Sequence, residues 1–363
     1  MKVTFPHLGN IYFTSKAFLE DLGHQVIPPP VSSRRTLEIG SKHSPEMMCL
    51  PFKVFIGNYI ESIEMGADTI IIVGSCGPCR FGFYSAIQDD ILKDLGYDID
   101  TIILDSPWEG YKEFLTNLKR ITNANSVYEL VKSSRLAMDL MRLADDLTQM
   151  SNRVRAYAVD KKLVDQIMDD FLNNSVKVYG TNELIKLIKI TEEQLSNVRQ
   201  EEDYQPIRIG IIGEIYSIIE PFVNLEIERK LGNLGVLVDK SLTPTIWLEN
   251  HVINYPFGSK YENTIKGLAK PYLKTPVGGH GRETIGSAIY YKNMGYDGAI
   301  QILPLNCMPE IVAKSILKNV SEDLDFPIMT LVVDEMTGEA GYITRLEAFV
   351  DLLSKRRGKL VIG

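Results

Sequence analysis

The fold is indicated by a stretch in which a glycine turn leads into an apolar run: Met65-Gly66-Ala67-Asp68-Thr69-Ile70-Ile71-Ile72-Val73. A glycine in this position is typical of a helix end, and a short run of β-branched side chains is typical of a buried strand in a parallel sheet. Apolar residues at helical spacing across residues 51–65 predict the preceding helix. The stretch therefore predicts one helix-to-strand step of an α/β layer.

The same alternation continues on both sides of this stretch, which predicts a doubly wound parallel sheet. The other predicted elements are strands at residues 2–5, 25–27 and 101–104, helices at 11–22 and 83–95, and a polar loop at 32–44.

Residues 109–200 lose the strand pattern and place Leu, Met and Ile among charged residues at helical spacing. A second α/β pattern follows, with strands at 207–212, 236–238, 299–303 and 328–333 and helices near 222–231, 283–294, 311–320 and 342–353. We therefore predict an N-terminal α/β domain (residues 1–108), a helical connector (109–205) and a C-terminal α/β domain (206–363).

The two α/β patterns form an internal repeat. Met65-Gly66-Ala67-Asp68 precedes a strand and Cys76, and Met294-Gly295-Tyr296-Asp297 precedes a strand and Cys307, with a difference of two residues in length. The predicted fold is thus two similar doubly wound parallel-sheet domains, of the flavodoxin or Rossmann type, with a helical connector.

Composition excludes several classes of protein. The chain has 363 residues and a formal net charge of −8, whereas nucleic acids and anionic membranes favour a basic face. Its apolar runs are far shorter than the roughly 20 residues of a membrane span, and the first residues do not open a signal peptide. Four cysteines are too few for a disulfide scaffold. We expect a soluble, cytoplasmic protein.

Three of the four cysteines share a Cys-x-Pro pattern before a predicted helix: Cys49-Leu50-Pro51, Cys76-Gly77-Pro78 and Cys307-Met308-Pro309. Proline suits the first helical turn, so the pattern places a thiol beside helix-start N–H groups that favour anions. Cys79 adjoins the second proline. Cys76 and Cys307 also follow predicted strand ends, where open α/β sheets bind ligands. We expect a thiolate-ligated centre between the two domains.

Several identities for this centre remain open. An iron–sulfur cluster with three or four Cys ligands suits widely separated cysteines. Structural zinc is disfavoured because zinc sites usually pair two close CxxC motifs, and this chain has one. Cys76-Gly77-Pro78-Cys79 also matches a thioredoxin-like dithiol, which leaves Cys49 and Cys307 unexplained. The cysteines could also be small buried hydrophobes.

Other candidate residues carry less weight. Lys53 and Arg80 flank cysteines and could offset the charge of a cluster, although cations near helix starts are usually solvated. His280, in the glycine-rich residues 278–283, is the histidine best placed for acid–base chemistry, although a flexible turn would look the same. Residues 210–214 follow a strand but match neither dinucleotide nor phosphate-loop motifs.

Five motifs together resemble the 2-hydroxyacyl-CoA dehydratase and benzoyl-CoA reductase superfamily, and more closely its branch near the double-cubane cluster proteins and the activase-associated iron–sulfur proteins. They are residues 48–53, 74–84, 213–216, 279–283 and 304–310. The resemblance implies an oxygen-sensitive, homodimeric iron–sulfur protein of anaerobes. Its low-potential electrons would come from a separate ATP-hydrolysing activase of the actin, Hsp70 and sugar-kinase type.

The resemblance also implies that Cys49, Cys76, Cys79 and Cys307 are the cluster ligands. Four cysteines fall short of the six or so that a double cubane needs. One 4Fe–4S cluster could use all four, three could bind with the fourth as a gate, or two chains could share a larger cluster. The first arrangement fits best and favours an electron carrier or small-substrate reductase over the alternative of a radical 2-hydroxyacyl-CoA dehydratase subunit.

Overall fold

The computed structural model describes residues 1–363 except 75–79, 105–109, 123–126, 251–253, 255–256 and 363. The chain divides into two compact units. The N-terminal unit comprises Met1–Ala144 and Asn173–Ile188, and the C-terminal unit comprises Asp145–Leu172 and Lys189–Gly363. The domain boundaries near residues 108 and 205 stay a prediction from sequence.

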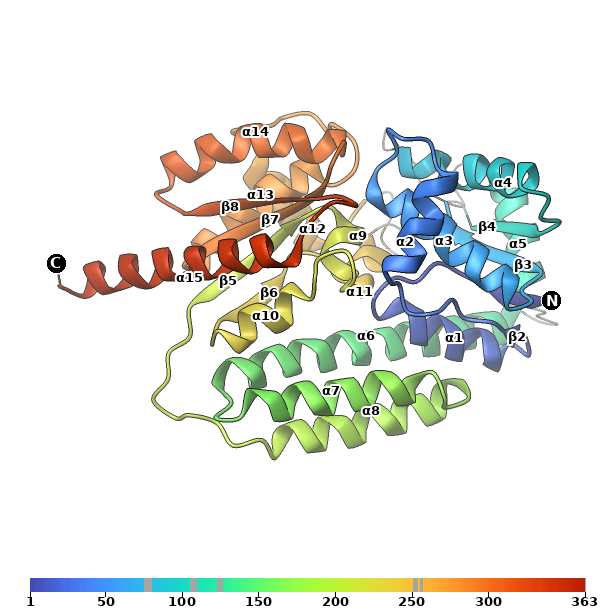
Figure 1. The fold of residues 1–363 in the computed structure, drawn as a ribbon, viewed down its shortest axis with the longest axis horizontal. Coiled ribbons are helices and arrows are strands. Elements are labelled where there is room, and N and C mark those ends of the chain that lie inside the picture. Colours follow the sequence, from blue (N-terminus) through green and yellow to red (C-terminus); the bar gives the residue numbers. More distant parts are fainter. Residues whose placement is uncertain (75–79, 105–109, 123–126, 251–253, 255–256, 363) are drawn as a thin grey trace. The chain divides into compact units, whose positions relative to one another are not determined.

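The N-terminal unit contains a four-stranded parallel sheet of order β2-β1-β3-β4. Its strands are β1 (Lys2–Thr4), β2 (Gln25–Val26), β3 (Thr69–Val73) and β4 (Asp100–Leu104), with Val3 opposite Thr69 and Ile71 opposite Ile102. Its helices are α1 (Ile11–Asp21), α2 (Arg34–His43), α3 (Leu50–Glu64), the 3₁₀ turn η1 (Arg80–Phe83), α4 (Tyr84–Asp94) and α5 (Tyr111–Thr122). In Figure 1, α1 covers one face of this sheet and α3 and α4 the other.

The C-terminal unit contains a second parallel sheet of order β6-β5-β7-β8. Its strands are β5 (Arg208–Gly213), β6 (Leu237–Lys240), β7 (Gly298–Pro304) and β8 (Ile328–Val333). Its helices are α9 (Ile215–Ile219), α10 (Ile227–Asn233), α11 (Pro244–Leu248), α12 (Lys260–Ala269), α13 (Gly281–Asn293), α14 (Met308–Asp323) and α15 (Glu339–Ile362). Helices α14 and α15 lie on opposite faces of this sheet (Figure 1).

The two sheets confirm the predicted α/β fold with two doubly wound parallel sheets, because their strand orders are equivalent. The repeat extends to a pair of contacts at the strand starts. In the N-terminal unit, the Lys2 N–H donates to Asp68 Oδ1 (2.7 Å); in the C-terminal unit, the Arg208 N–H donates to Asp297 Oδ2 (2.8 Å). Both aspartates lie in the repeated motif that was evident from the sequence.

A glycine allows the same close helix approach in each half. A Cβ at Gly57 of α3 would collide with the Thr36 carbonyl of α2, and a Cβ at Gly286 of α13 would collide with the Ile265 carbonyl of α12. Each glycine lies nine residues before its motif's own glycine, Gly66 or Gly295. The helix pairs α2–α3 and α12–α13 are therefore equivalent elements of the duplication.

Three local expectations were wrong. The polar loop predicted at residues 32–44 is helix α2, whose N-cap is Ser33 and whose buried face includes Leu37. The helix predicted from residue 222 begins only at Ile227, because Leu225 and Glu226 adopt positive φ angles of 53° and 54°. Helices α11 and α12 had not been predicted. Helix α2 was missed because its sequence is largely polar, and the start of α10 was misplaced because two residues before it have positive φ angles.

The segment between the sheets is helical, as predicted. Its helices are α6 (Val127–Tyr157), α7 (Lys161–Ser175) and α8 (Gly180–Ser196). Each of the three contributes residues to both compact units. Leu140 and Leu147, which were part of the predicted apolar stripe, are buried on α6.

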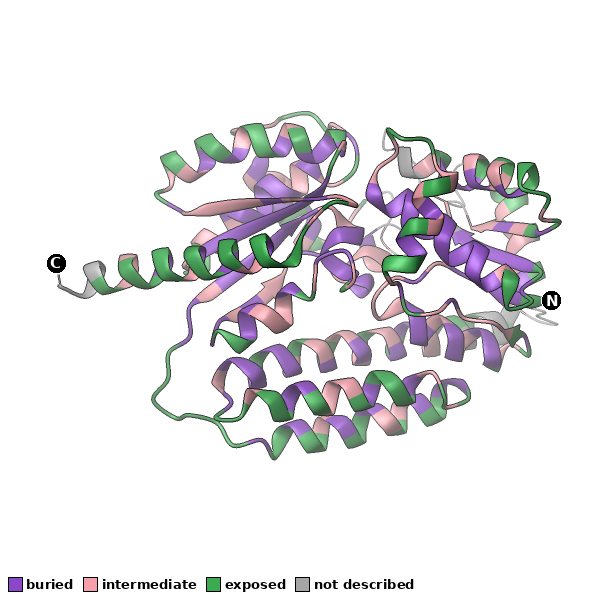
Figure 2. Ribbon diagram, viewed as in Figure 1, coloured by how far each residue is buried: buried purple, intermediate pink, exposed green. Residues whose placement is uncertain are grey.

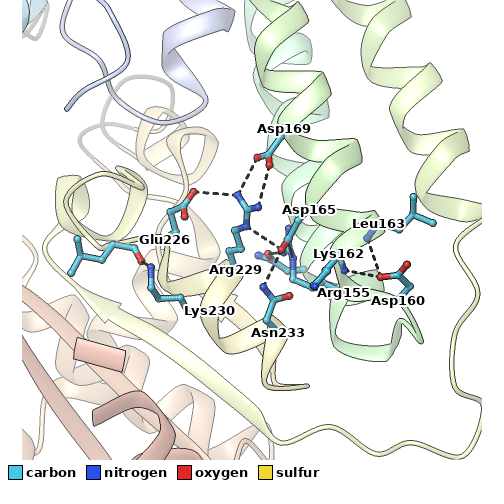
Figure 3. A network of polar contacts seen from close by, with 12 residues as sticks. Arg155, Asp160, Lys162, Leu163, Asp165, Asp169, Glu226, Arg229, Lys230 and Asn233 are labelled. Atoms are coloured by element: carbon cyan, nitrogen blue, oxygen red, sulfur yellow. Dashed lines mark hydrogen bonds and ion pairs between the residues drawn. The ribbon is translucent and has the colours of Figure 1, made fainter. Parts of the chain in front are cut away.

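A buried ion network ties the helical segment to α10 within the C-terminal unit (Figure 3). The Arg155 Nε of α6 lies 2.8 Å from Asp165 Oδ1 of α7, and the second carboxylate oxygen of Asp165 lies 3.1 Å from Arg229 Nε of α10. Arg229 also makes two bonds of 3.1 Å to the carboxylate of Asp169. Because Arg155 is 4% exposed and Asp165 7% exposed, these charges depend on each other.

In the C-terminal sheet, burial is greatest in the two inner strands, β5 and β7 (Figure 2). Every residue of β7 is buried, and this strand lies at the centre of its sheet between β5 and β8. No helix in the described part of the chain has the length and apolar character needed to cross a membrane.

Candidate functional site

Cys307 stands at the carboxyl end of β7, where the chain turns into α14. The turn contains Asn306 at a φ of 67°, and Cys307 is the N-cap of α14 with Pro309 in the first helical turn. The Cys307 N–H donates to the Pro304 carbonyl (3.1 Å) and the Cys307 carbonyl accepts from the Ile311 N–H (2.9 Å). These contacts confirm the predicted helix-start position of a residue that is 9% exposed.

Cys49 has the same role at the start of α3. It is the N-cap residue, with extended backbone (φ −69°, ψ 155°), and Pro51 lies in the first turn. Its Sγ is in hydrogen-bond contact with the Tyr84 hydroxyl at the start of α4. Tyr84 is 2% exposed and packs edge-on against Phe52, with ring centroids 5.0 Å apart. A buried phenol therefore holds this thiol in place.

Cys76 and Cys79 lie outside the described residues, and so does the side chain of Arg80. Cys49 belongs to the N-terminal unit and Cys307 to the C-terminal unit. Among the residues that the structure describes, no group of three or more His, Cys, Asp and Glu side chains converges on a metal position. The described part of the predicted site thus consists of two separate helix-start thiols.

Lys53 differs from the expectation of a solvated cation. It is 4% exposed on α3, one turn beyond Cys49, and its Nζ donates to the Glu46 carbonyl at 3.1 Å. Because α3 is buried along most of its length, a long side chain at this position is enclosed and its ammonium bonds to backbone. A positive charge is thus fixed in the first turns of the helix that Cys49 caps.

His280 is the N-cap residue of α13 and is half-buried. The preceding glycines, Gly278 and Gly279, have positive φ angles of 86° and 46°. A Cβ at Gly281 would lie 2.5 Å from the Pro309 carbonyl, so the starts of α13 and α14 are in contact. The structure therefore brings the start of α13, with His280, to the end of the sheet that carries Cys307.

Sequence reasoning missed a buried polar network at the first turn of α14, the helix that Cys307 caps. The Gln301 amide of β7 donates to both the side-chain Oε2 (2.9 Å) and the backbone carbonyl (3.1 Å) of Glu310 in α14. The Thr284 hydroxyl of α13 donates to Glu310 Oε1 (2.8 Å), and the Thr330 hydroxyl of β8 donates to Gln301 Oε1 (3.1 Å). Side chains from β7 and α13 therefore bond to one carboxyl group of α14, and β8 is joined to them through Gln301.

A second buried carboxyl lies at the end of the neighbouring strand β5. Glu214 caps the short helix α9 and accepts bonds of 2.9 Å from the Tyr216 N–H, the Ser217 N–H and the Ser217 hydroxyl. Burial raises the pKa of Glu214, and the three hydrogen bonds oppose that rise. Strands β5 and β7 are where the strand order reverses, so Glu214 lies at the usual ligand-binding edge of such sheets.

The Glu310 carboxyl has a strongly perturbed pKa. Burial raises the pKa of Glu310 to about 7; the hydrogen bonds from Gln301 and Thr284 lower it, and the negative charges of Glu214 and Glu283 raise it further. A carboxyl with such a pKa exchanges a proton near neutral pH. One signal for it was present in the sequence, because Gln301 is a polar residue inside an otherwise apolar strand.

The stability of the protein should therefore depend on pH through Glu310. The folded-state pKa of about 7 exceeds the ordinary value of 4.5, so the contribution of Glu310 is complete below pH 4.5 and is lost as pH rises through 7. Between pH 5 and pH 8 the loss should be about 2 kcal/mol. Urea unfolding of wild type and Glu310→Gln at both pH values measures it. Equal pH dependence in the two proteins would contradict the assignment.

Comparisons with known proteins give no relative. No family model matches the chain, and no curated protein matches it significantly.

Proposed function

We propose that this chain is an iron–sulfur protein that accepts low-potential electrons from an ATP-hydrolysing partner and passes them to a substrate or acceptor. The proposed ligands of its 4Fe–4S cluster are Cys49, Cys76, Cys79 and Cys307. The proposed partner is an activase of the actin, Hsp70 and sugar-kinase type, and the proposed assembly is a cytoplasmic homodimer. The partner and the assembly rest on the family resemblance of the sequence motifs.

The observation that carries the proposal is the shared position of Cys49 and Cys307. Each is the N-cap of a helix with proline in its first turn. The helices have 15 and 16 residues, so their starts present backbone N–H groups and the positive end of a helix dipole. Such a start stabilises a thiolate, which is the form that binds iron. The donor chemistry of both residues fits the cluster.

The duplication supports a matching role for Cys76. In the sequence Cys76 follows β3, and Cys307 follows β7, and these strands occupy the same place in their sheets. A ligand at that strand end of each half is what a repeated architecture would supply. Cys79, three residues on, completes a set of four thiols.

When bound, a 4Fe–4S cluster supplies reversible one-electron transfer at low potential. The chain's residues provide its surroundings. Helix-start N–H groups can donate to sulfur, and such bonds tune the potential. The buried ammonium of Lys53 offsets negative charge near Cys49, and His280 stands at a helix start where it can move a proton to or from a substrate. Four thiol ligands favour electron transfer over substrate binding at iron.

Metal and sulfide analysis of anaerobically purified protein tests the proposal. We expect about four iron and four sulfide per chain, with a broad absorbance near 400 nm that dithionite bleaches. Zinc without sulfide, or thiols without any metal, would contradict it. A matched preparation exposed to air should lose iron and sulfide together.

A further inference from the structure

Gln301 and Glu310 are polar side chains at buried positions of the C-terminal unit. Gln301 is fully buried in the central strand β7, and Glu310 is 1% exposed in the first turn of α14. Apolar side chains of similar size would avoid the cost of removing an amide and a carboxyl from water. A buried polar network that is fully bonded instead fixes one arrangement of its parts.

The arrangement fixed here is the register of α14 against the sheet. Gln301 bonds to both the side chain and the backbone carbonyl of Glu310, so α14 can neither slide along β7 nor rotate without breaking two bonds. Glu310 lies three residues after Cys307, about 4.5 Å along the helix axis. Bonds from Thr284 and Thr330 hold the pair from α13 and β8.

We propose that Gln301 and Glu310 are positioning residues for Cys307, which hold its thiol in one place at the carboxyl end of β7. This inference rests on the proposed function, but the position of the Cys307 thiol can be tested in protein without any metal. Neither residue is a ligand; both act through the first turn of α14.

The reactivity of the thiol in metal-free, reduced protein tests the positioning. Cys307 is 9% exposed, so alkylation requires the start of α14 to open. Glu310→Ala removes the carboxylate that accepts from the Gln301 amide and the Thr284 hydroxyl, and leaves the Gln301 amide only its bond to the backbone carbonyl at position 310. The rate at which iodoacetamide alkylates Cys307, followed by peptide mass spectrometry, should then rise about tenfold or more. The rate at Cys49 in the same samples should not change.

Two variants separate positioning from general destabilisation. Glu310→Gln can still accept from Gln301 and, because a hydroxyl also accepts, can donate to Thr284; its Cys307 rate should stay within about threefold of wild type. Ser321→Ala removes the bond from the Ser321 hydroxyl to the Phe326 carbonyl (2.7 Å) at the other end of α14, and should leave the Cys307 rate unchanged. Rates are compared after correction for each variant's free energy of unfolding.

The inference fails if Glu310→Ala leaves the Cys307 rate within about twofold of wild type, or if Glu310→Gln opens the site as much as Glu310→Ala does. In protein that carries iron, Glu310→Ala should also shift the reduction potential while Ser321→Ala does not. If the protein binds no iron, the proposed function fails while the thiol rates still decide the positioning. If it binds iron and the thiol rates do not respond, the positioning alone fails.

Discussion

Replacing Cys307 by alanine should reduce the iron of anaerobically purified protein from about four atoms per chain to fewer than about one. A methyl group cannot ligate iron. Because Cys307 is the described thiol of the C-terminal unit, its loss removes that unit's proposed ligand. Iron, sulfide and the visible spectrum of the variant measure the effect.

Met308→Ala is the matched control for this experiment. Met308 follows Cys307 directly and is 49% exposed, so its side chain can be shortened without disturbing the core. This variant should keep the full iron content. Circular dichroism should show that Cys307→Ala is folded, since it removes only a sulfur atom. A full complement of iron in Cys307→Ala would restrict the ligands to the N-terminal unit and refute a centre that both units supply.

Replacing Arg155 by alanine should lower the free energy of unfolding by about 3 to 5 kcal/mol. Arg155 contacts Asp165, whose side chain is 9% exposed, and without the guanidinium that carboxylate keeps Arg229 and Asn233 as partners. The stem of Arg155 also packs against Gly232, so alanine would lose apolar contact as well. Urea unfolding followed by circular dichroism measures the change.

An exposed ion pair on the same helix, α6, provides the control for this experiment. Arg142 lies 3.3 Å from Asp139 in an exposed pair, and Arg142→Ala should cost less than about 1 kcal/mol. Combining Arg155→Met with Asp165→Leu should recover much of the loss, because no unpaired charge then remains buried. A loss for Arg155→Ala no larger than that for Arg142→Ala would show that the buried network contributes little.

Strands β3, β7 and β8 could be predicted because each is a short, mostly apolar run bounded by turn residues. Residues 69–73 and 328–333 matched β3 and β8 residue for residue. Helix α2 could not be predicted in this way, since it is largely polar and is held by the Ser33 cap and by a few residues that pack against α3. Propensity did not reveal a helix that depends on such tertiary contacts.

In the candidate site, too, local features could be predicted from sequence and tertiary contacts could not. The helix-start positions of Cys49 and Cys307 follow from a local motif, because proline in the first turn is a property of three adjacent residues. The contact of Gln301 with Glu310 depends on α14 folding back over β7, and that packing exists only in three dimensions. The burial of Lys53 likewise reflects its neighbours in space. The helix-start cysteines were therefore visible in the sequence, whereas the buried contacts of Glu310 and Lys53 were not.

The equivalent contacts of Asp68 and Asp297 have a consequence for the history of the chain. Each half closes its own ladder of hydrogen bonds from consecutive strands, β1 to β4 or β5 to β8, and each secures its first strand with an aspartate in the same place. Such a layout can arise when one ancestral gene segment is copied in tandem. The two halves differ in their thiols, with three cysteines in the first half and one in the second.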